Sequence, residues 1–542
     1  MKTNKRFLQA IFCFALMLIT LCSCKKESKS PFNFDYVPVQ MSKGDSWSII
    51  DKDGNEVVKE EYPAEAEVSL VQDRVYWVKT NGKCQLFSVD SPKKPLTEEE
   101  FTKVTLFNAG VAVVSNPNQL IRIINTKGET VTTLPNAVKK CWAFSNDGYA
   151  VFKDANDKVG ILDSKGEIVV HATYSDMIVD IPEGLTLAKE NADDNKWIII
   201  NMKGEKQGEI DTEKYHILNK TIYDGKIIVR DENNEDGPSI VLDKTGKKLF
   251  EIRKAREKYG SAVYFDGYLT FMNADNKCGV ANDEGEEIIR PKYDALTNLG
   301  NGEFAAKKGD KWGIINEKDE TILDFDYEEG CLKMGDNYLI KDASGWVLVG
   351  KDKKEITSCD KVEVGAVSSY AEYVDVEVFV NAILKLIEEY EQPQTAAAYA
   401  KERSLSVDDY HYSRSFGRKV EYDNKLTATL GVNYEDYVTE EKSHIEQVND
   451  GWFTNNITVS DGWGWTNVLP RNVNGSFELS SDAGVEMKDI YNAVIDKLKE
   501  DRKKISDDTF SKNVKMAGKN VECRIYCGLV GQNISLDISF HQ

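Results

Sequence analysis

The chain has 542 residues, a formal net charge of −21 and 41% hydrophobic residues. This balance is typical of a folded chain, and the length allows two to four domains. The acidic charge argues against a general nucleic-acid binder, because phosphate backbones bind basic surfaces. Five histidines and scattered cysteines offer few metal ligands. We therefore expect neither a metal nor another cofactor.

The first 24 residues have the features of a secretory signal. Three basic residues precede an apolar stretch over residues 7–20, which is too short to span a bilayer comfortably. The sequence Leu21-Cys22-Ser23-Cys24 resembles the bacterial lipobox, which implies lipidation of Cys24 and a polar tether over residues 25–32. An ordinary cleaved signal or a retained start helix are the alternatives. The resemblance predicts a lipid-anchored protein of the bacterial cell envelope, at the outer membrane, on its periplasmic side or at the cell surface.

A repeated unit fills residues 33–360. Its copies begin at intervals of 34 to 42 residues, at Trp47, Cys84, Ile121, Val159, Trp197, Ser239, Cys278, Trp312 and Trp346. Most copies have a short apolar strand, then Asp or Asn, two residues and Gly, then a second strand. The Asp or Asn side chain caps its own turn, and Gly accepts the positive φ that the turn requires. Each copy is therefore predicted to be a β-hairpin followed by one further strand.

Two neighbouring copies resemble the WG-repeat family. Residues 311–316 read KWGIIN and residues 288–294 read IIRPKYD, close to the family pattern of K-W-G, a turn and a Tyr-Asp end. The resemblance implies a β-propeller over residues 33–360, with an open β-solenoid as the alternative. We expect eight blades, because propellers usually have four to eight. The strand at Tyr36–Met41 is expected to complete the last blade, which begins at Trp346.

Residues 361–542 have a different pattern and are predicted to form a smaller α+β domain that resembles no family known to us. Apolar residues recur at helical spacing over 374–390 and 485–505. Strands are expected at 425–434, near 455–459 and 476–479, and at 521–527 and 534–540. The fold class as a whole is therefore mainly β, with a propeller followed by this domain.

An aromatic-rich stretch is the best candidate ligand site in the sequence. Trp452, Phe453, Trp463 and Trp465 lie among Gly, Asn and Asp residues. Such side chains stack on sugar rings or form protein contacts, although packing beneath the helices would also explain them.

Other candidate sites are weaker. The acidic stretch Asp231–Gly237 could bind Ca²⁺, but it lacks the order of a calcium loop. Residues 408–413 place an acid, a histidine and a serine together, yet such triads are assembled in space and not along one strand. No residue is predicted to be catalytic.

The sequence favours a non-enzymatic envelope lipoprotein that acts as a binding or scaffold module. Its partners would be the membrane, through the lipid anchor, and a protein or glycan of the envelope. The alternative is a glycan-processing hydrolase with a carboxylate site in the propeller funnel or in residues 361–542. A third possibility is that the C-terminal domain docks to another envelope complex while the propeller acts as a spacer.

Overall fold

The computed structural model describes residues 33–541 with several gaps. The residues outside the description are 180, 182–183, 235–236, 253–262, 274, 363–364, 366, 393, 395, 405–414, 423–424, 435–440, 450–453, 464–469, 481–484 and 517–518, together with 1–32 and 542. The chain forms two compact units that divide between Tyr373 and Val374. The boundary predicted from the sequence lies after residue 360, 13 residues earlier than the observed one.

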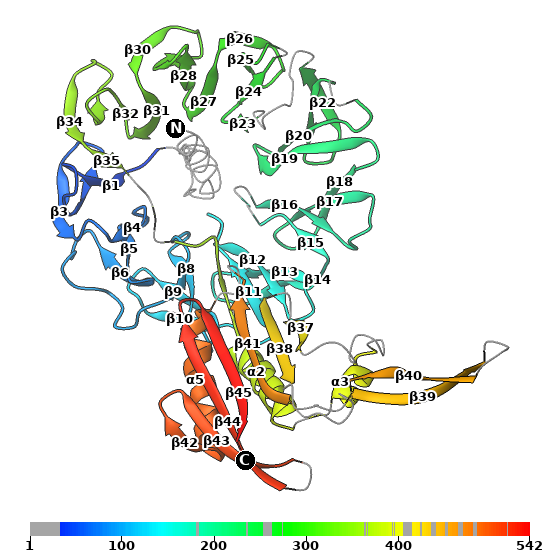
Figure 1. The fold of residues 1–542 in the computed structure, drawn as a ribbon. Coiled ribbons are helices and arrows are strands. Elements are labelled where there is room, and N and C mark those ends of the chain that lie inside the picture. The colour runs from blue at the N-terminus through cyan, green and yellow to red at the C-terminus, as the bar shows by residue number, and fades with distance from the viewer. Residues whose placement is uncertain are drawn as a thin grey trace. The chain divides into compact units, whose positions relative to one another are not determined.

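The described residues of the first unit form nine small antiparallel sheets around a ring, the blades of a β-propeller (Figure 1). We number the blades along the chain and give their strands from the centre outward. Blade 1 has β35 (Lys361–Val362), β1 (Tyr36–Gln40), β2 (Trp47–Asp51) and β3 (Glu56–Tyr62). Blade 2 has β4 (Glu67–Val68), β5 (Val75–Thr80) and β6 (Lys83–Ser88). Blade 3 has β7 (Lys103–Val104), β8 (Val111–Ser115), β9 (Arg122–Asn125) and β10 (Thr130–Thr133).

The remaining six blades each have four consecutive strands. Blade 4 has β11 (Val138–Trp142), β12 (Tyr149–Asp154), β13 (Val159–Asp163) and β14 (Ile168–Tyr174). Blade 5 has β15 (Asp176–Met177), β16 (Leu185–Lys189), β17 (Lys196–Asn201) and β18 (Lys206–Asp211). Blade 6 has β19 (Tyr215–Tyr223), β20 (Lys226–Asp231), β21 (Ser239–Asp243) and β22 (Lys248–Ile252). Blade 7 has β23 (Val263–Phe265), β24 (Tyr268–Met272), β25 (Cys278–Ala281) and β26 (Glu287–Tyr293). Blade 8 has β27 (Ala295–Gly300), β28 (Glu303–Lys308), β29 (Lys311–Asn316) and β30 (Thr321–Tyr327). Blade 9 has β31 (Glu329–Met334), β32 (Asn337–Lys341), β33 (Trp346–Val349) and β34 (Glu355–Cys359).

The prediction of a propeller is confirmed, but the expected number of eight blades is wrong. All nine repeat starts lie at the third strand of a blade, so each copy forms a blade of its own among the described residues. The copy at Trp346 lies in a complete four-stranded sheet and borrows no strand. Strand β1 instead pairs with β2 of its own blade and with β35, which returns from the other end of the unit. This pairing closes the ring and excludes the open solenoid.

Three repeat starts are followed by a glycine, Gly160, Gly279 or Gly313, and a close approach between two strands requires it there. A Cβ atom added to Gly160 would lie 2.4 Å from the carbonyl oxygen of Val170 in the next strand. At Gly313 the same atom would lie 2.8 Å from the carbonyl oxygen of Leu323. Both glycines lie at a register shift between the third and fourth strands. In blade 1 this place holds Ser48, whose hydroxyl accepts a hydrogen bond from the backbone of Glu60 at 2.9 Å.

The predicted turn forms in the same way in blade after blade. In blade 4, the Asp163 side chain accepts hydrogen bonds from the amides of Lys165 and Glu167, each at 2.9 Å. Gly166 follows with a φ of 82°. In blade 8, where Asp319 replaces the glycine, that residue has a φ of 65°. The turn thus keeps its shape where the sequence pattern degenerates.

Blade 2 is irregular at its outer edge, where the sequence pattern is lost. It has three regular strands among the described residues. The place of a fourth strand is taken by residues 96–101, where Leu96 donates to Leu86 and Phe101 pairs with Cys84. Loss of the turn pattern in this copy thus coincides with loss of the regular fourth strand.

Apolar side chains fill the contact between the first and last blades. Val39 and Ile50 of blade 1 pack with Leu339 and Leu348 of blade 9, and all four are fully buried. Such interdigitated faces exclude water along the whole contact, which is the main favourable contribution to folding. The ring is therefore closed by packing as well as by the pairing of β1 with β35.

A buried ion pair joins blades 8 and 9. Lys333 of β31 is 2% exposed and its ammonium group lies 2.5 Å from Glu303 of β28. The other oxygen of Glu303 accepts a hydrogen bond from Lys351 at 2.6 Å. Burial alone would raise the pKa of Glu303, but the two lysines outweigh it and lower the pKa.

After β35 the chain continues along the inner strands of the next three blades. Gly365 donates to Val68 of blade 2, and Ser368 donates to Val104 of blade 3. Strand β36 (Tyr370–Glu372) then adds a fifth strand to blade 4 by pairing with β11. We call residues 363–373 the inner segment. It joins blades 2, 3 and 4 by backbone hydrogen bonds.

The second unit is a seven-stranded antiparallel sheet with helices against one face. The helices are α2 (Val376–Glu391), α3 (Ala396–Glu402) and α5 (Met487–Asp501). The strands are, in their order across the sheet, β37 (Ser415–Tyr422), β38 (Leu426–Tyr434), β41 (Pro470–Leu479), β45 (Asn533–His541), β44 (Lys519–Val530), β43 (Thr509–Met516) and β42 (Lys503–Ser506). A separate hairpin is formed by β39 (Glu441–Asn449) and β40 (Thr454–Trp463). Within the described residues, no helix is long and apolar enough to cross a membrane.

This second unit has two related halves. The last strands of the halves, β41 and β45, are neighbours in the sheet, with β38 and β37 on one side and β44, β43 and the additional strand β42 on the other. Helices α2 and α5, which begin the halves, have the same pattern at a constant separation. Val374, Asp375, Phe379, Asn381, Ala382, Ile383 and Ile387 correspond to Val485, Glu486, Ile490, Asn492, Ala493, Val494 and Leu498. The same spacing of 111 residues separates Glu391 from Arg502, whose buried side chains form a bidentate ion pair at 2.7 and 3.0 Å.

The predicted elements of this unit are confirmed in part. Helix α2 and strands β38, β44 and β45 lie where the sequence indicated. The second helix is shorter than the predicted 485–505, because the chain leaves the helix after Asp501 to begin β42. Helix α3 and strands β37, β39 and β43 were not predicted. Strands β37 and β43 mix charged residues with few apolar ones, and β39 has only Ile445 and Val448 as aliphatic residues, a weaker signal than the apolar runs of the central strands.

The ion pair at Glu303 predicts a pH dependence of stability. A carboxylate with a lowered pKa in the folded state stabilises the protein above its unfolded pKa, here about 4.5, and this contribution is lost as the pH falls towards the folded value. We expect Glu303→Gln to be less stable than the wild type at pH 7 and to lose less stability between pH 5 and about 3. Chemical denaturation across this range measures both. An unchanged pH slope would contradict the interpretation.

Candidate functional site

The two halves of the second unit differ after their first helix and also before their last strand, where only the first half has the hairpin of β39 and β40 among the described residues. In the second half, α5 ends at Asp501 and β42 begins at Lys503. In the first half, residues 392–414 separate α2 from β37 and contain the additional helix α3. This insertion places polar side chains beside the end of α2 and the edge strand β37. A structural addition present in only one of two related halves is a reasonable place to look for a specific function.

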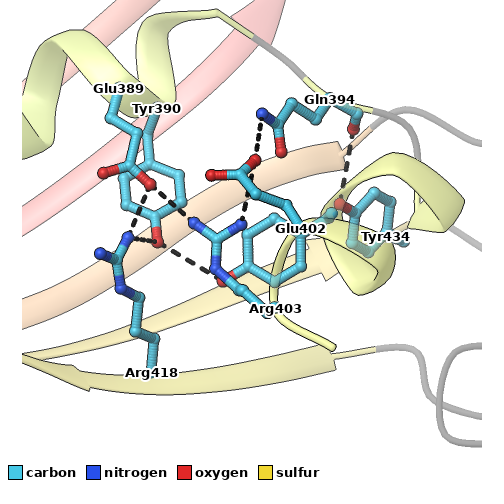
Figure 2. Close-up of polar contacts among 8 residues, drawn as sticks. Glu389, Tyr390, Gln394, Glu402, Arg403, Arg418 and Tyr434 are labelled. Carbon is cyan, nitrogen blue, oxygen red and sulfur yellow. Dashed lines mark hydrogen bonds and ion pairs between the residues drawn. The ribbon is translucent and has the colours of Figure 1, made fainter. Parts of the chain in front are cut away.

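Two arginines share one carboxylate at this place (Figure 2). Arg403, just after α3, and Arg418 of β37 each lie 2.6 Å from the same oxygen of Glu389 in α2. Arg418 also donates to the Tyr390 hydroxyl at 3.1 Å. Burial acts to lower the pKa of Arg418, but Tyr390 and Glu389 outweigh it and raise the pKa. Both guanidinium groups are therefore charged at any physiological pH.

Tyrosines surround these charges. The guanidinium carbon of Arg403 lies 3.7 Å from the centre of the Tyr399 ring, a cation–π contact. The hydroxyls of Tyr390 and Tyr399 lie 3.4 Å apart, and burial together with this contact raises the pKa of Tyr399. Tyr434 donates to the backbone oxygen of Gln394 at 3.4 Å, which ties the insertion to β38 (Figure 2). The insertion is thus held in place by buried rings and their hydroxyls.

A second acid covers the outer side of this cluster. Glu402 is about half exposed, at 54%, and accepts a hydrogen bond from the Gln394 side chain at 2.7 Å. Its nearer oxygen lies 3.6 Å from Nη1 of Arg403, which is an ion pair without a hydrogen bond. Arg403 Nε and Nη1 are buried and have no hydrogen-bond partner among the described residues. The guanidinium of Arg403 therefore holds unused donor capacity.

An open pocket of about 400 Å³ lies against these groups. Its lining residues are Tyr399, Glu402, Arg403, Gly417 and Arg418. The volume is within the range of small-molecule sites. Two forked donors beside an aromatic ring are the groups that proteins use to bind carboxylates and phosphates. We call this site the arginine pocket.

The aromatic residues proposed from the sequence cannot be placed. Trp452, Phe453 and Trp465 lie outside the described residues, and so does Cys24. Trp463 is the last residue of β40, where its backbone pairs with Glu441, and its side chain lies outside the description. The prediction of a stacking surface therefore remains a prediction.

The weaker candidates find no support as sites. Residues 408–413 and part of Asp231–Gly237 lie outside the described residues. In the part of the chain that the structure describes, no group of three His, Cys, Asp or Glu side chains could hold a metal ion. A shallow depression of about 470 Å³ on blade 5 is lined by Asp193, Asp194, Asn195, Lys196, Glu209 and Asp211. It has no aromatic side chain beside its acids.

The arginine pocket was missed because its residues lie far apart in the sequence. Arg403 and Arg418 are separated by residues that were assigned to no element, and neither forms a motif with Glu389. The only available signal was the second copy of the α2 pattern at α5. Comparison of the two copies would have marked residues 392–414 as an insertion.

One family model matches the chain. Residues 279–312 match the WG containing repeat, a segment that runs from the third strand of blade 7 to that of blade 8. The chain therefore contains this repeat, as its sequence pattern predicted. No curated protein sequence matches the chain.

Two solved structures resemble the chain only distantly. The computationally designed Ika8 protein has 12% identity and a TM-score of 0.33, over 54% of this chain and 95% of that protein. BamB from Moraxella catarrhalis has 17% identity and a TM-score of 0.29, over 51% of this chain and 96% of that protein. Similarities at this level carry no argument here, and the propeller follows from the strand pairing itself.

The shared carboxylate can be tested by its removal. Glu389→Ala leaves two neighbouring guanidinium groups without the acid that separates them, and we expect a loss of about 1–3 kcal/mol in stability. Glu388→Ala, one residue earlier and exposed, is the matched control. Chemical denaturation of both variants measures the difference. Equal stability of the two variants would show that the shared carboxylate of Glu389 contributes nothing to the free energy of unfolding.

Proposed function

We propose that this protein is a non-enzymatic binding or scaffold module of the bacterial cell envelope. Lipid on Cys24 would anchor it to the membrane, and the nine-bladed ring would present a rigid surface to a protein or glycan partner. The C-terminal unit would add a second binding surface.

The observation that carries this proposal is the closure of the ring by its own chain. Strand β35 completes blade 1, and the inner segment then pairs along blades 2, 3 and 4. A closed ring holds its surface loops in fixed positions, which lowers the entropy that a partner must overcome on binding. Rigid presentation of loops is a common basis of molecular recognition.

The protonation behaviour of the acids favours binding over glycan hydrolysis. A glycosidase needs one carboxylic acid with a raised pKa to protonate the leaving group. In the described parts of the chain, each Asp or Glu whose pKa clearly departs from its ordinary value has a lowered pKa. They are Asp90, Asp194, Glu209, Asp243, Asp283, Asp294, Glu303, Asp342, Asp352, Glu421, Asp507 and Glu522. Turn amides and lysines hold these carboxylates in the charged form.

The anchor is tested by exchange of two neighbouring cysteines. We expect Cys24→Ser to abolish incorporation of a labelled fatty acid and to release the protein from the membrane fraction. Cys22→Ser, which alters the same segment, should keep both properties. Metabolic labelling and membrane fractionation measure the outcome. Continued labelling of Cys24→Ser would rule out this anchor.

The binding role is tested with residues 25–542 as bait. We expect either selective signals on a glycan array or a reproducible protein partner from solubilised envelope. Trp463→Ala combined with Trp465→Ala should remove glycan binding if the aromatic stretch is the sugar site, and should leave it unchanged otherwise. Turnover of an envelope glycan by the purified chain would overturn the non-enzymatic proposal.

A further inference from the structure

We propose that the arginine pocket of the second unit binds a carboxylate group on a small molecule about the size of a sugar ring. The ligand carboxylate would take the place of the Glu402 side chain beside Arg403. This inference does not rest on the envelope proposal, because it concerns only the C-terminal unit and is tested with purified protein.

The donors for such a ligand are already present. Arg403 uses one nitrogen, Nη2, to bind Glu389, while its Nε and Nη1 have no hydrogen-bond partner among the described residues. Buried donors without acceptors are rare in folded proteins and cost free energy, more so when they carry charge. An incoming oxygen would remove that cost. The gain is available only to a group that reaches the guanidinium.

Glu402 occupies the approach to these donors and is weakly held. Its side chain is 54% exposed and its oxygen lies 3.6 Å from Nη1 of Arg403, too far for a hydrogen bond. Gln394 provides its hydrogen bond at 2.7 Å. An exposed ion pair of this kind contributes only about 0–1 kcal/mol. Rotation of Glu402 towards solvent would therefore cost little and would open Arg403 to the pocket.

The local charge favours a carboxylate over a phosphate. Two arginines face two glutamates, so the cluster is neutral as it stands. A ligand with one negative charge that replaces Glu402 keeps this balance. A phosphate dianion would add an uncompensated charge beside Glu389, which stays between the two arginines. Arg403 and Arg418 already bind a carboxylate oxygen of Glu389 at 2.6 Å, which demonstrates the donor geometry.

The pocket has the space and the ring for an organic ligand. Its volume of about 400 Å³ lies beside Tyr399 and is open to solvent. Only the first half of the unit has α3, and the second half passes from α5 to β42 without an insertion. Three of the five lining residues, Tyr399, Glu402 and Arg403, thus come from a segment that the second half lacks.

The test uses residues 25–542 and a matched pair of probes. D-glucuronate and D-glucose differ by a carboxylate in place of a hydroxymethyl group. Calorimetry at millimolar probe concentrations should detect glucuronate and not glucose. Inorganic phosphate should bind more weakly than glucuronate. Equal binding of the two sugars, no binding of glucuronate, or tighter binding of phosphate would each overturn the proposal.

Two substitutions with opposite expected effects locate the site. Glu402→Gln removes the competing carboxylate and should tighten glucuronate binding about two- to fivefold. Arg403→Gln should weaken it about tenfold or more. Lys401→Gln, an exposed residue of the same helix, is the control and should change affinity little. A gain of affinity in Glu402→Gln cannot result from misfolding, and its absence would overturn the exchange with Glu402. Failure here would leave the anchor and envelope-partner tests unaffected.

Discussion

The structure of the first unit depends on one pairing between distant parts of the chain. Strand β1, near residue 40, and strand β35, near residue 361, share the sheet of blade 1. Val39 of the first blade and Leu339 of the last blade lie in one buried apolar cluster, so closure of the ring also covers apolar side chains of both blades. The inner segment extends this connection to blades 2, 3 and 4. The ends of the repeat array thus protect each other, a role that separate capping repeats have in open arrays.

Within each blade, two local constraints explain why the repeat has the residues it has. The Asp or Asn side chain of the turn accepts hydrogen bonds from two backbone amides. The third residue after it must adopt a positive φ. Where the glycine of the WG pair is present, the fourth strand lies too close for a Cβ atom, whereas Ser48 occupies the same place in blade 1. The tryptophan satisfies no such constraint, since cysteine, valine or isoleucine fills the same buried place in other blades. The Trp-Gly pair is therefore lost in several copies of the repeat that still form a blade.

The second unit combines a duplicated framework with two additions to its first half, the segment after α2 and the hairpin of β39 and β40. The corresponding helices α2 and α5 meet through the buried ion pair of Glu391 and Arg502, two residues at the same place in their halves. A charge-reversed pair at related positions lets two copies of one element pack without two like charges in the core. The segment after α2 is not part of this framework. The arginine pocket forms where this segment meets the framework, because Arg403 follows α3 while Glu389 and Arg418 belong to α2 and β37.

The sequence by itself determined the repeat, its turns, the first helix of the second unit and its central strands. These depend on interactions between residues close together in the chain, such as Asp163 with the amides that follow it, or the apolar spacing of α2. Only the tertiary structure decided how the ring closes, because that depends on which strand β1 finds across more than 300 residues. It also decided the arginine pocket, because Glu389, Arg403 and Arg418 become neighbours only when β37 packs beside α2. Contacts of this kind leave no periodic pattern in the sequence, since a single carboxylate shared between two arginines can be supplied from any element that reaches it.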